Sequence, residues 1–209
     1  MDENQRQSAF VSALTTEHFV LQTASSTTVT ESAARASIYI MSLSSSLVAI
    51  GFVSQSREAF GPFVASVLPA VFVLGLFTII RLVDVNGEYM QYLARMARIR
   101  SYYHSLTPEA AEYFGPRRDG RPETASIPAL QLGPKIAFLT TSSTMVAFIN
   151  NVVAGAGIAL LARWLLGAHH TLFAVLIGVV GATALMAAFL AYQKWRFSMF
   201  EPVADDARK

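Results

Sequence analysis

The sequence predicts an all-α membrane protein, a four-transmembrane-helix bundle with cytoplasmic helical extensions. The mean hydropathy of the 209 residues is +0.43, which a water-soluble domain of this length rarely reaches. Four stretches, each at least 21 residues long, contain no Asp, Glu, Lys or Arg: residues 36–56, 59–80, 136–162 and 164–193. About 20 helical residues at 1.5 Å each cross a hydrocarbon core of roughly 30 Å. Each stretch is therefore long enough to span a membrane.

Positive charge is distributed unevenly around these stretches. Of the 16 Lys and Arg residues, only Arg57 and Arg163 lie near the two short connections, at residues 56–62 and 163–170. Lys and Arg residues close to membrane helices are retained in the cytoplasm. We therefore expect a multi-pass protein of a cell inner membrane, with both termini and residues 81–135 in the cytoplasm.

Aromatic residues near the ends of the stretches support the same orientation. Trp164 lies at the outer end of the third stretch, Tyr192 and Trp195 at the inner end of the fourth, and Tyr39 near the inner end of the first. Amphipathic aromatic rings favour the headgroup region of a bilayer. These side chains are therefore expected at the membrane surface.

The segment boundaries follow from the charges that flank each stretch. We expect a partly helical N-terminal cytoplasmic segment, a membrane domain and a cytoplasmic tail over residues 1–35, 36–194 and 195–209. The membrane helices are predicted at about residues 36–56, 62–81, 136–163 and 171–194, and the cytoplasmic segment at 82–135.

The N-terminal segment and the first short loop carry their own local signals. Residues 8–35 contain no Gly or Pro, which favours a helix that leads into the first crossing, with a surface-lying amphipathic segment as the alternative. Gly61 and Pro62 predict a stop and a restart between the first two crossings. Pro69 should kink the second crossing or be accommodated by its neighbours.

The second crossing is predicted to continue as a helix over residues 82–105. Apolar and tyrosine side chains recur there at spacings of three and four: Leu82, Val85, Tyr89, Tyr92, Met96, Ile99 and Tyr103. A short helix should then begin at Thr107-Pro108-Glu109 and end at Gly115-Pro116. Residues 115–134, with four prolines among charged residues, indicate a loop.

Polar residues within the third and first crossings form the main candidate site. On a helical wheel the polar and small residues of the third crossing occupy one face, opposite a bulky apolar one. The polar intramembrane face consists of Thr140, Ser143, Thr144, Asn150 and Asn151, together with Ser42, Ser45 and Ser46 of the first crossing. A buried amide needs hydrogen-bond partners. The face therefore either lines a polar path or ligand site, or fixes helix packing, and packing is the favoured interpretation.

Small residues also mark surfaces for close helix packing. Ser37, Ser44 and Gly51 form a second small stripe on the first crossing, which places this helix inside the bundle or at a subunit interface. The fourth crossing carries a small-residue ridge at i, i+4 and i+8, formed by Ala174, Gly178 and Ala182. Packing within one subunit and dimerisation explain that ridge equally well.

The arginines Arg95, Arg98 and Arg100 are candidates for binding anionic lipid head groups or another cytoplasmic anion. Nearby tyrosines could stack on a base, or pack a helical hairpin. The alternative is that these arginines set the topology and pair with neighbouring glutamates, and we favour it. The pI is near 9.0, but the net charge is only +2. We therefore expect no nucleic-acid partner.

The sequence lacks the motifs of several enzyme classes. It contains no cysteine, which excludes disulfides, thiolate catalysis and cysteine-ligated metals. His169-His170 is an adjacent pair without a third ligand, so a metal site is not expected. No phosphate-binding loop or nucleophile elbow occurs. We expect no enzyme activity and no cofactor, and the ratio of 13 Arg to 3 Lys indicates a bacterium with a GC-rich genome.

Two features define a resemblance in layout. The segment Glu31-Ser-Ala-Ala-Arg35-Ala36 leads directly into the first crossing, and a helix rich in Tyr and Arg follows the second. In this the chain resembles bacterial four-helix transmembrane proteins, largely uncharacterised, which include small membrane effectors of nucleotide-signalled antiphage systems. The resemblance implies a membrane effector. Such effectors often carry a recognisable sensor domain, which this sequence lacks, and no functional residue is carried over.

Three functional hypotheses remain at this point. The first is a homo-oligomeric pore-like or membrane-effector protein, with a polar interior formed by the first and third crossings. The alternative is a membrane-anchored scaffold or accessory subunit that binds a cytoplasmic protein or an anionic ligand through its cytoplasmic helices. The third is a lipid-modifying membrane enzyme, which requires a cluster such as Glu88, Arg95 and His104.

Overall fold

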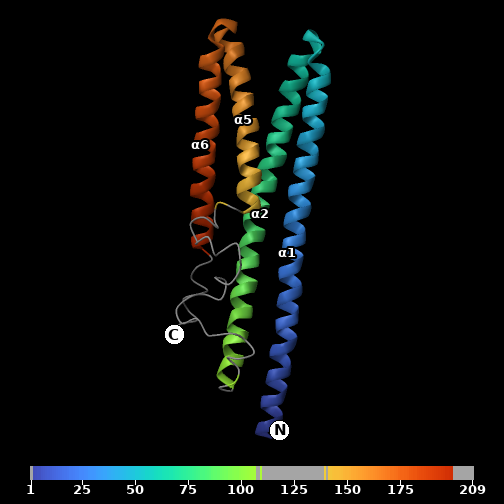
Figure 1. Cartoon of the computed structure of the whole chain (residues 1–209), viewed down its shortest axis with the longest axis vertical. Coiled ribbons are helices and arrows are strands. Elements are labelled where there is room, and N and C mark those ends of the chain that lie inside the picture. Colours follow the sequence, from blue (N-terminus) through green and yellow to red (C-terminus); the bar gives the residue numbers. More distant parts are fainter. Residues whose placement is uncertain (1, 107–108, 110–138, 140, 200–209) are drawn as a thin grey trace. The chain divides into compact units, whose positions relative to one another are not determined.

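The computed structural model describes residues 2–106, 109, 139 and 141–199. Within these residues the chain forms four long helices and no strand (Figure 1). The helices are α1 (Glu3–Val53), α2 (Arg57–Leu106), α5 (Ser142–Leu166) and α6 (Thr171–Ser198), and the 3₁₀ helix η4 (Ala168–His170) joins the last two. Each of the four is long and apolar enough to cross a membrane. The predicted all-α class with four such helices is confirmed.

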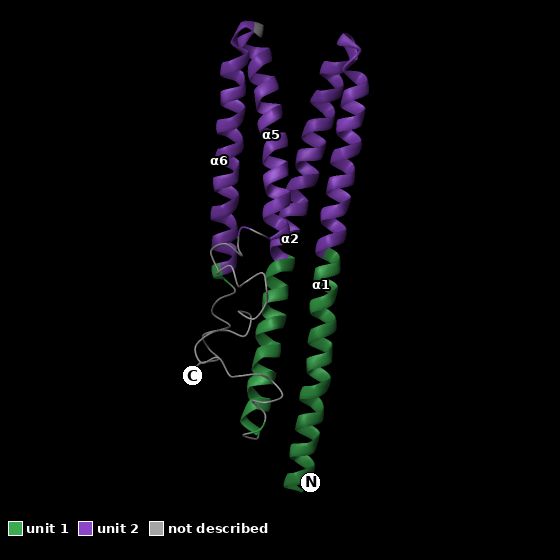
Figure 2. Cartoon of the chain, in the orientation of Figure 1, with its two compact units in different colours: residues 1–31, 85–138, 198–209 green, residues 32–84, 139–197 purple. Residues whose placement is uncertain are grey.

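The chain divides into two compact units (Figure 2). Unit 1 consists of residues 1–31, 85–138 and 198–209, and unit 2 consists of residues 32–84 and 139–197. α1 and α2 contribute to both units, whereas α5 lies wholly in unit 2.

α1 extends far beyond the first apolar stretch. It contains 51 residues, where about 20 suffice to cross the hydrocarbon core of a bilayer. The helix predicted over residues 8–35 is confirmed, and it joins the first apolar stretch without a break. No Gly or Pro interrupts residues 8–35, so the helical backbone hydrogen bonds continue through the polar part of the sequence.

The connection between α1 and α2 differs from the prediction. The loop was expected to reach residue 62, but α2 already begins at Arg57, and both Pro62 and Pro69 lie inside it. Ser56 provides the reason, because its backbone carbonyl accepts from the Phe60 amide at 3.0 Å and its Oγ from the Ala59 amide at 3.4 Å. The bond to the Phe60 amide is the first regular backbone bond of the helix, and the bond to the Ala59 amide satisfies one of the amide groups that a helix start leaves without a partner. α2 then continues to Leu106, which confirms the predicted helix over 82–105.

Unit 1 contains the N-terminal part of α1 and the C-terminal part of α2. The Phe10 and Tyr102 rings meet edge to face with centroids 5.4 Å apart, and Thr15 Oγ1 lies 3.2 Å from the Tyr103 hydroxyl. These contacts join the first turns of α1 to the last turns of α2. Buried residues of the two helices are Leu21, Ser25 and Thr28 on α1, and Val85 and Ile99 on α2. We call this contact between α1 and α2 in unit 1 the seam. Its α1 side includes small polar side chains, whereas these α2 residues are apolar.

Unit 2 contains an apolar core built from all four helices. Its buried members are Ala36, Tyr39, Leu43, Val71, Ile79, Leu82, Val83, Val146, Ala147 and Phe189. Tyr39 is completely buried among these helices, so its ring is not exposed to lipid head groups. Trp164, by contrast, is 79% exposed, as an interfacial ring requires. The difference arises because Tyr39 lies on the face of α1 that points into the core.

α6 begins at the predicted residue, whereas α5 begins six residues after its predicted start. The third helix was expected over 136–163 and is observed over Ser142–Leu166. Thr141 caps it, since its Oγ1 accepts a hydrogen bond from the Thr144 amide at 3.3 Å. α6 reaches Ser198, four residues past its predicted end. The short helix predicted from residue 107 and the loop over 115–134 lie outside the described residues, apart from Glu109.

Candidate functional site

The polar face predicted on α5 points into unit 2. Ser143 is fully buried, Asn150 is 1% exposed, and Thr144 and Asn151 are also buried. The fifth predicted member, Thr140, lies outside the described residues. A helix face of hydroxyls and amides can be buried at low cost only if its polar atoms have hydrogen-bond partners. The partners of these side chains therefore define the site.

Gln193 of α6 is the centre of the first group of partners. Its side chain has no exposed surface. Its Nε2 donates to Thr141 Oγ1 and to Ser143 Oγ, both at 3.2 Å, and its Oε1 accepts from Thr144 Oγ1 at 3.3 Å. Thr141 Oγ1 also lies 2.9 Å from the hydroxyl oxygens of Ser143 and Thr144. This cluster fastens the start of α5 to the last turns of α6.

A second group of partners surrounds Asn150. The Tyr39 hydroxyl of α1 donates to Asn150 Oδ1 at 3.2 Å. Gly75 of α2 faces the same point, because a Cβ added there would collide with the Asn150 amide and would lie 2.9 Å from the Tyr39 ring. Only glycine leaves room for this hydrogen bond. Three helices therefore meet at Asn150.

The neighbouring amide has a different environment. Asn151 Nδ2 lies 3.6 Å from the Met186 sulfur of α6, which is a weak hydrogen-bond acceptor. Asn150 and Asn151 are adjacent and project about 100° apart, so they contact different helices. The structure thus brings the two asparagines into one buried layer, but it gives them separate partners.

Two further contacts lie among residues that are only partly buried. The hydroxyl groups of Ser32 on α1 and Ser142 on α5 are 2.8 Å apart. The Arg196 guanidinium of α6 donates to Asp84 Oδ1 of α2 from Nε at 3.1 Å and from Nη2 at 3.0 Å. About a third of each charged side chain is exposed, so this ion pair contributes little to stability, at most about 1 kcal/mol. It does fix the register of α6 against α2.

The serines predicted on α1 do not join this network. Ser42 donates to the Ile38 carbonyl at 2.8 Å and Ser46 to the Ser42 carbonyl at 2.7 Å, so each bonds within its own helix. Ser45 is exposed. The structure therefore separates the α1 serines from the α5 polar face with which the sequence grouped them.

The small-residue ridge of α6 packs against α5 within the chain. Ala174 and Gly178 are buried and Ala182 is half-buried. A Cβ added at Gly178 would collide with the Gly155 carbonyl oxygen, and one added at Gly155 would lie 2.8 Å from the Ala182 Cβ. The two backbones thus approach as closely as small residues permit.

The three candidate arginines lie on α2 in unit 1. Arg95 and Arg98 are exposed and project about 60° apart, whereas Arg100 is half-buried and lies about 140° from Arg95. Arg95 and Arg98 can therefore meet one anionic surface together, without Arg100. Of the residues considered for a lipid-modifying site, Glu88 shares the face of Arg95, but His104 lies about 180° around the helix.

Several important residues of the network were not predicted from the sequence. Gln193 was treated only as the end of a charge-free stretch, and Gly75, Asp84 and Arg196 received no role. An amide in the last turns of an apolar helix was the available signal for Gln193, because such a group requires partners. Nothing in the sequence indicated that those partners would be the hydroxyls at the start of α5.

The site consists of neutral hydroxyls and amides, with one ion pair among less buried residues. Among the described residues no three His, Cys, Asp or Glu side chains lie close enough together to hold a metal ion. The geometry thus supports holding four helices in fixed register. No family model, curated protein or solved structure matches this chain. The described residues thus form a helical protein in which four helices, long and apolar enough to span a membrane, are joined by an internal polar network.

Proposed function

We propose that this protein is an integral membrane protein that serves as an anchored scaffold or accessory subunit. In this proposal the apolar segments of the four helices cross an inner membrane. Both termini and the Tyr- and Arg-rich end of α2 lie in the cytoplasm, where they bind a partner. The single observation that carries the proposal is the burial of the α5 polar face, with Asn150 only 1% exposed and bonded to Tyr39 of the same chain.

A buried polar group that stabilises the fold differs from a functional one in its accessibility. A pore or ligand site needs polar groups that remain accessible to water or to a ligand. The Gln193 amide instead bonds the hydroxyl groups of Thr141, Ser143 and Thr144, and Asn150 accepts from Tyr39. These bonds hold the apolar segments of the helices in a single fixed arrangement. Binding is then left to the helical segments outside them.

The exposed arginines Arg95 and Arg98 supply the chemistry for a partner. They lie in the part of α2 that follows its apolar stretch, and they share one face. Guanidinium groups pair well with carboxylates and phosphates. The expected partner therefore presents anionic groups to this face of α2.

Photo-crosslinking in living cells tests the proposal. A photoreactive amino acid placed at the exposed position Ser101 should give one defined adduct, to be identified by mass spectrometry. The adduct should be lost when Arg95, Arg98 and Arg100 are changed to Ala together. It should persist in the matched control Asn151→Leu, which alters only the buried network. Equal adducts in both variants, or none in the native background, would contradict the proposal.

A pore-like homo-oligomer is the second candidate, and one observation favours it. Ser45 lies within the first apolar stretch and is exposed, and so are Ser37 and Ser44. Several copies with these serines toward a common axis would form a polar path. Ion flux through reconstituted protein that falls on Ser45→Leu would favour the pore, whereas the scaffold predicts no flux from any variant.

A further inference from the structure

The N-terminal half of α1 has two opposite faces. One face packs in unit 1, and its buried or half-buried residues recur at spacings of three and four: Val11, Leu14, His18, Leu21, Ser25 and Thr28. At 100° per residue, the opposite side of the helix consists of exposed residues, most of them small: Ala9, Ser12, Thr16, Val20, Thr23, Thr27 and Thr30. We name these seven residues the outer face of α1.

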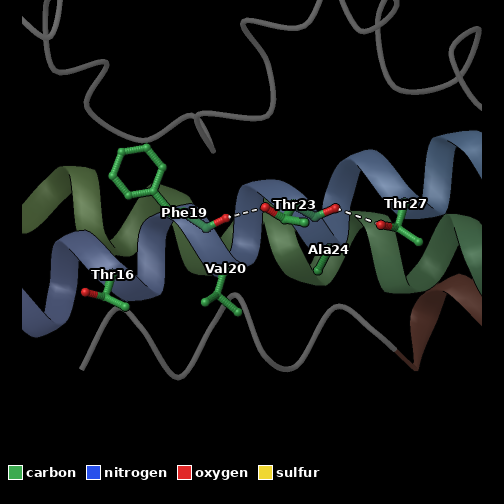
Figure 3. A pocket seen from close by; sticks show the side chains of 6 residues that line it. All are labelled: Thr16, Phe19, Val20, Thr23, Ala24 and Thr27. Atoms are coloured by element: carbon green, nitrogen blue, oxygen red, sulfur yellow. Dashed lines mark hydrogen bonds between the residues drawn. The ribbon is translucent and has the colours of Figure 1, made fainter.

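The threonine hydroxyls of the outer face form hydrogen bonds within their own helix. The Thr23 hydroxyl donates to the Phe19 carbonyl at 2.9 Å and the Thr27 hydroxyl to the Thr23 carbonyl at 3.0 Å (Figure 3). Thr16 and Thr30 bond the carbonyls four residues before them in the same way. The hydroxyl groups of these four threonines therefore have acceptors within their own helix. No buried hydrogen bond to a partner is needed for the face to be covered.

The outer face also carries no charge. Between residues 7 and 30 the only charged residue is Glu17, which projects about 100° from Thr16. Phe19 is 63% exposed and Val20 56% exposed, and both line a shallow open groove with Thr16, Thr23, Ala24 and Thr27 (Figure 3). A helix that faces water over this length normally displays charges, so this face is built to be covered.

We propose that the outer face of α1 binds the same face of a second copy of this chain, with the two α1 helices parallel. The absence of charge on the outer face favours an occupant that is itself uncharged. A partner with charged groups, protein or lipid head group, would lose their hydration without a counter-charge on α1. A second copy presents a surface that is equally uncharged and equally small, and small residues let two helices approach closely.

The parallel arrangement rests on the membrane anchoring proposed above. Two copies inserted with the same topology have α1 helices that point the same way. A two-fold axis along such a pair places each residue opposite its own counterpart. Thr16, Thr23 and Thr30 are seven residues apart, the repeat of a left-handed helix pair, so all three fall on the axis together.

Disulfide crosslinking tests this interface directly, because the native chain contains no cysteine. Single substitutions Thr16→Cys, Thr23→Cys and Thr30→Cys are oxidised in isolated membranes. Each should give at least about 5-fold more covalent dimer than Glu17→Cys and Gln22→Cys, which are exposed on other sides of the same helix. Equal crosslinking at all five positions, or adducts to a different protein, would overturn the interface.

Charge variants provide a second measurement. Thr23→Glu and Thr23→Lys, each combined with Thr16→Cys, should lose the dimer when expressed alone and regain it when expressed together. Dimer formation by Thr23→Glu alone would overturn the proposal. Alkaline washing of the same membranes distinguishes a failure of the proposed membrane anchoring from a failure of the proposed α1 interface. Protein released by the wash contradicts the anchoring itself, whereas protein that stays in the membrane without periodic crosslinks contradicts only the α1 interface.

Discussion

Buried polar side chains differ in their hydrogen-bond partners between the two compact units. In unit 2 the Gln193 amide is completely buried and bonds three hydroxyl groups of α5. In unit 1 the Nδ1 atom of His18 is buried without a hydrogen-bond partner, and it is the one such side-chain atom among the described residues. Unit 2 also contains close backbone contacts at Gly155 and Gly178. In unit 1 the contacts include the Phe10–Tyr102 and Thr15–Tyr103 pairs.

The difference in hydrogen bonding indicates how one chain can combine a region with one fixed helix register and a more adaptable region. Satisfied buried polar groups and interlocked backbones exclude alternative helix registers, because each alternative leaves polar atoms unpaired or backbones in collision. A seam that mixes Leu, Ser, Thr and His side chains excludes fewer alternatives. We therefore expect unit 2 to resist local opening and unit 1 to open more readily. Substitutions in each unit can test that contrast.

The substitution Gly178→Ala should have the largest effect, because it forces α5 and α6 apart in unit 2. The new Cβ would collide with the Gly155 carbonyl and lie 2.8 Å from the Ala159 Cβ. We expect a loss of about 3 kcal/mol of unfolding free energy, measured as a lower Tm in mild detergent. The control is Gly61→Ala, whose Cβ meets nothing within 4 Å and should leave the Tm unchanged or slightly higher. A native Tm for Gly178→Ala would contradict the close approach.

The substitution Gln193→Leu tests the buried polar cluster of unit 2. It removes the amide that joins Thr141, Ser143 and Thr144 to α6, and we expect a loss of about 2 kcal/mol. Thermal unfolding in detergent measures the loss. The matched control is Thr183→Val on the same helix, whose exposed hydroxyl bonds only the Val179 carbonyl. If both variants unfolded at the same temperature, the cluster would have no role in fixing α6.

The Tyr39–Asn150 hydrogen bond is expected to contribute less. A double-mutant cycle with Tyr39→Phe and Asn150→Ala should yield a coupling energy of about 1 kcal/mol, as for other hydrogen bonds between membrane helices. Equilibrium unfolding of the four proteins in mixed micelles measures it. A coupling energy near zero would mean that Asn150 finds an equivalent partner elsewhere in unit 2.

The substitution His18→Leu should have the opposite sign, which sharpens the contrast between the units. It removes the buried Nδ1 atom that lacks a hydrogen-bond partner, so unit 1 should gain about 1 kcal/mol. Slower amide hydrogen exchange in residues 11–28, with unchanged exchange in α5, would show this gain. Gln22→Leu, at an exposed position of the same helix, should leave the exchange unchanged. Faster exchange in His18→Leu would show that the imidazole stabilises the seam.

Much of the helical architecture followed from the sequence because it depends on local properties. The absence of charges over 20 or more residues fixes where an apolar helix can lie, and the spacing of Val85, Ile99 and Tyr103 predicted that α2 continues past its apolar stretch. The predicted start of α2 is too late because it rested on Gly61 and Pro62 alone, and the capping hydroxyl of Ser56 was not recognised. A helix start depends on local chemistry, so it can be predicted from the sequence when the capping residue is recognised.

The candidate site was predicted only in part, because its partners are far apart in the sequence. The polar face of α5 was identified from its composition, but Tyr39 and Asn150 are 111 residues apart, and Asp84 and Arg196 are 112 apart. A periodic pattern shows which residues share a face of one helix. It does not show which other helix covers that face, so the burial of Tyr39 could not be predicted from the sequence.

Composition and spacing along the chain are enough to predict the four long apolar helices, the continuation of α1 and α2 beyond their apolar stretches, and the polar composition of one face of α5. Only the tertiary structure decided that this face turns inward to Tyr39, Gly75 and Gln193, and that the outer face of α1 stays exposed. The physical reason is that helix formation depends on neighbouring residues, whereas the pairing of faces depends on which combination of distant side chains satisfies buried polar atoms and fits without collision.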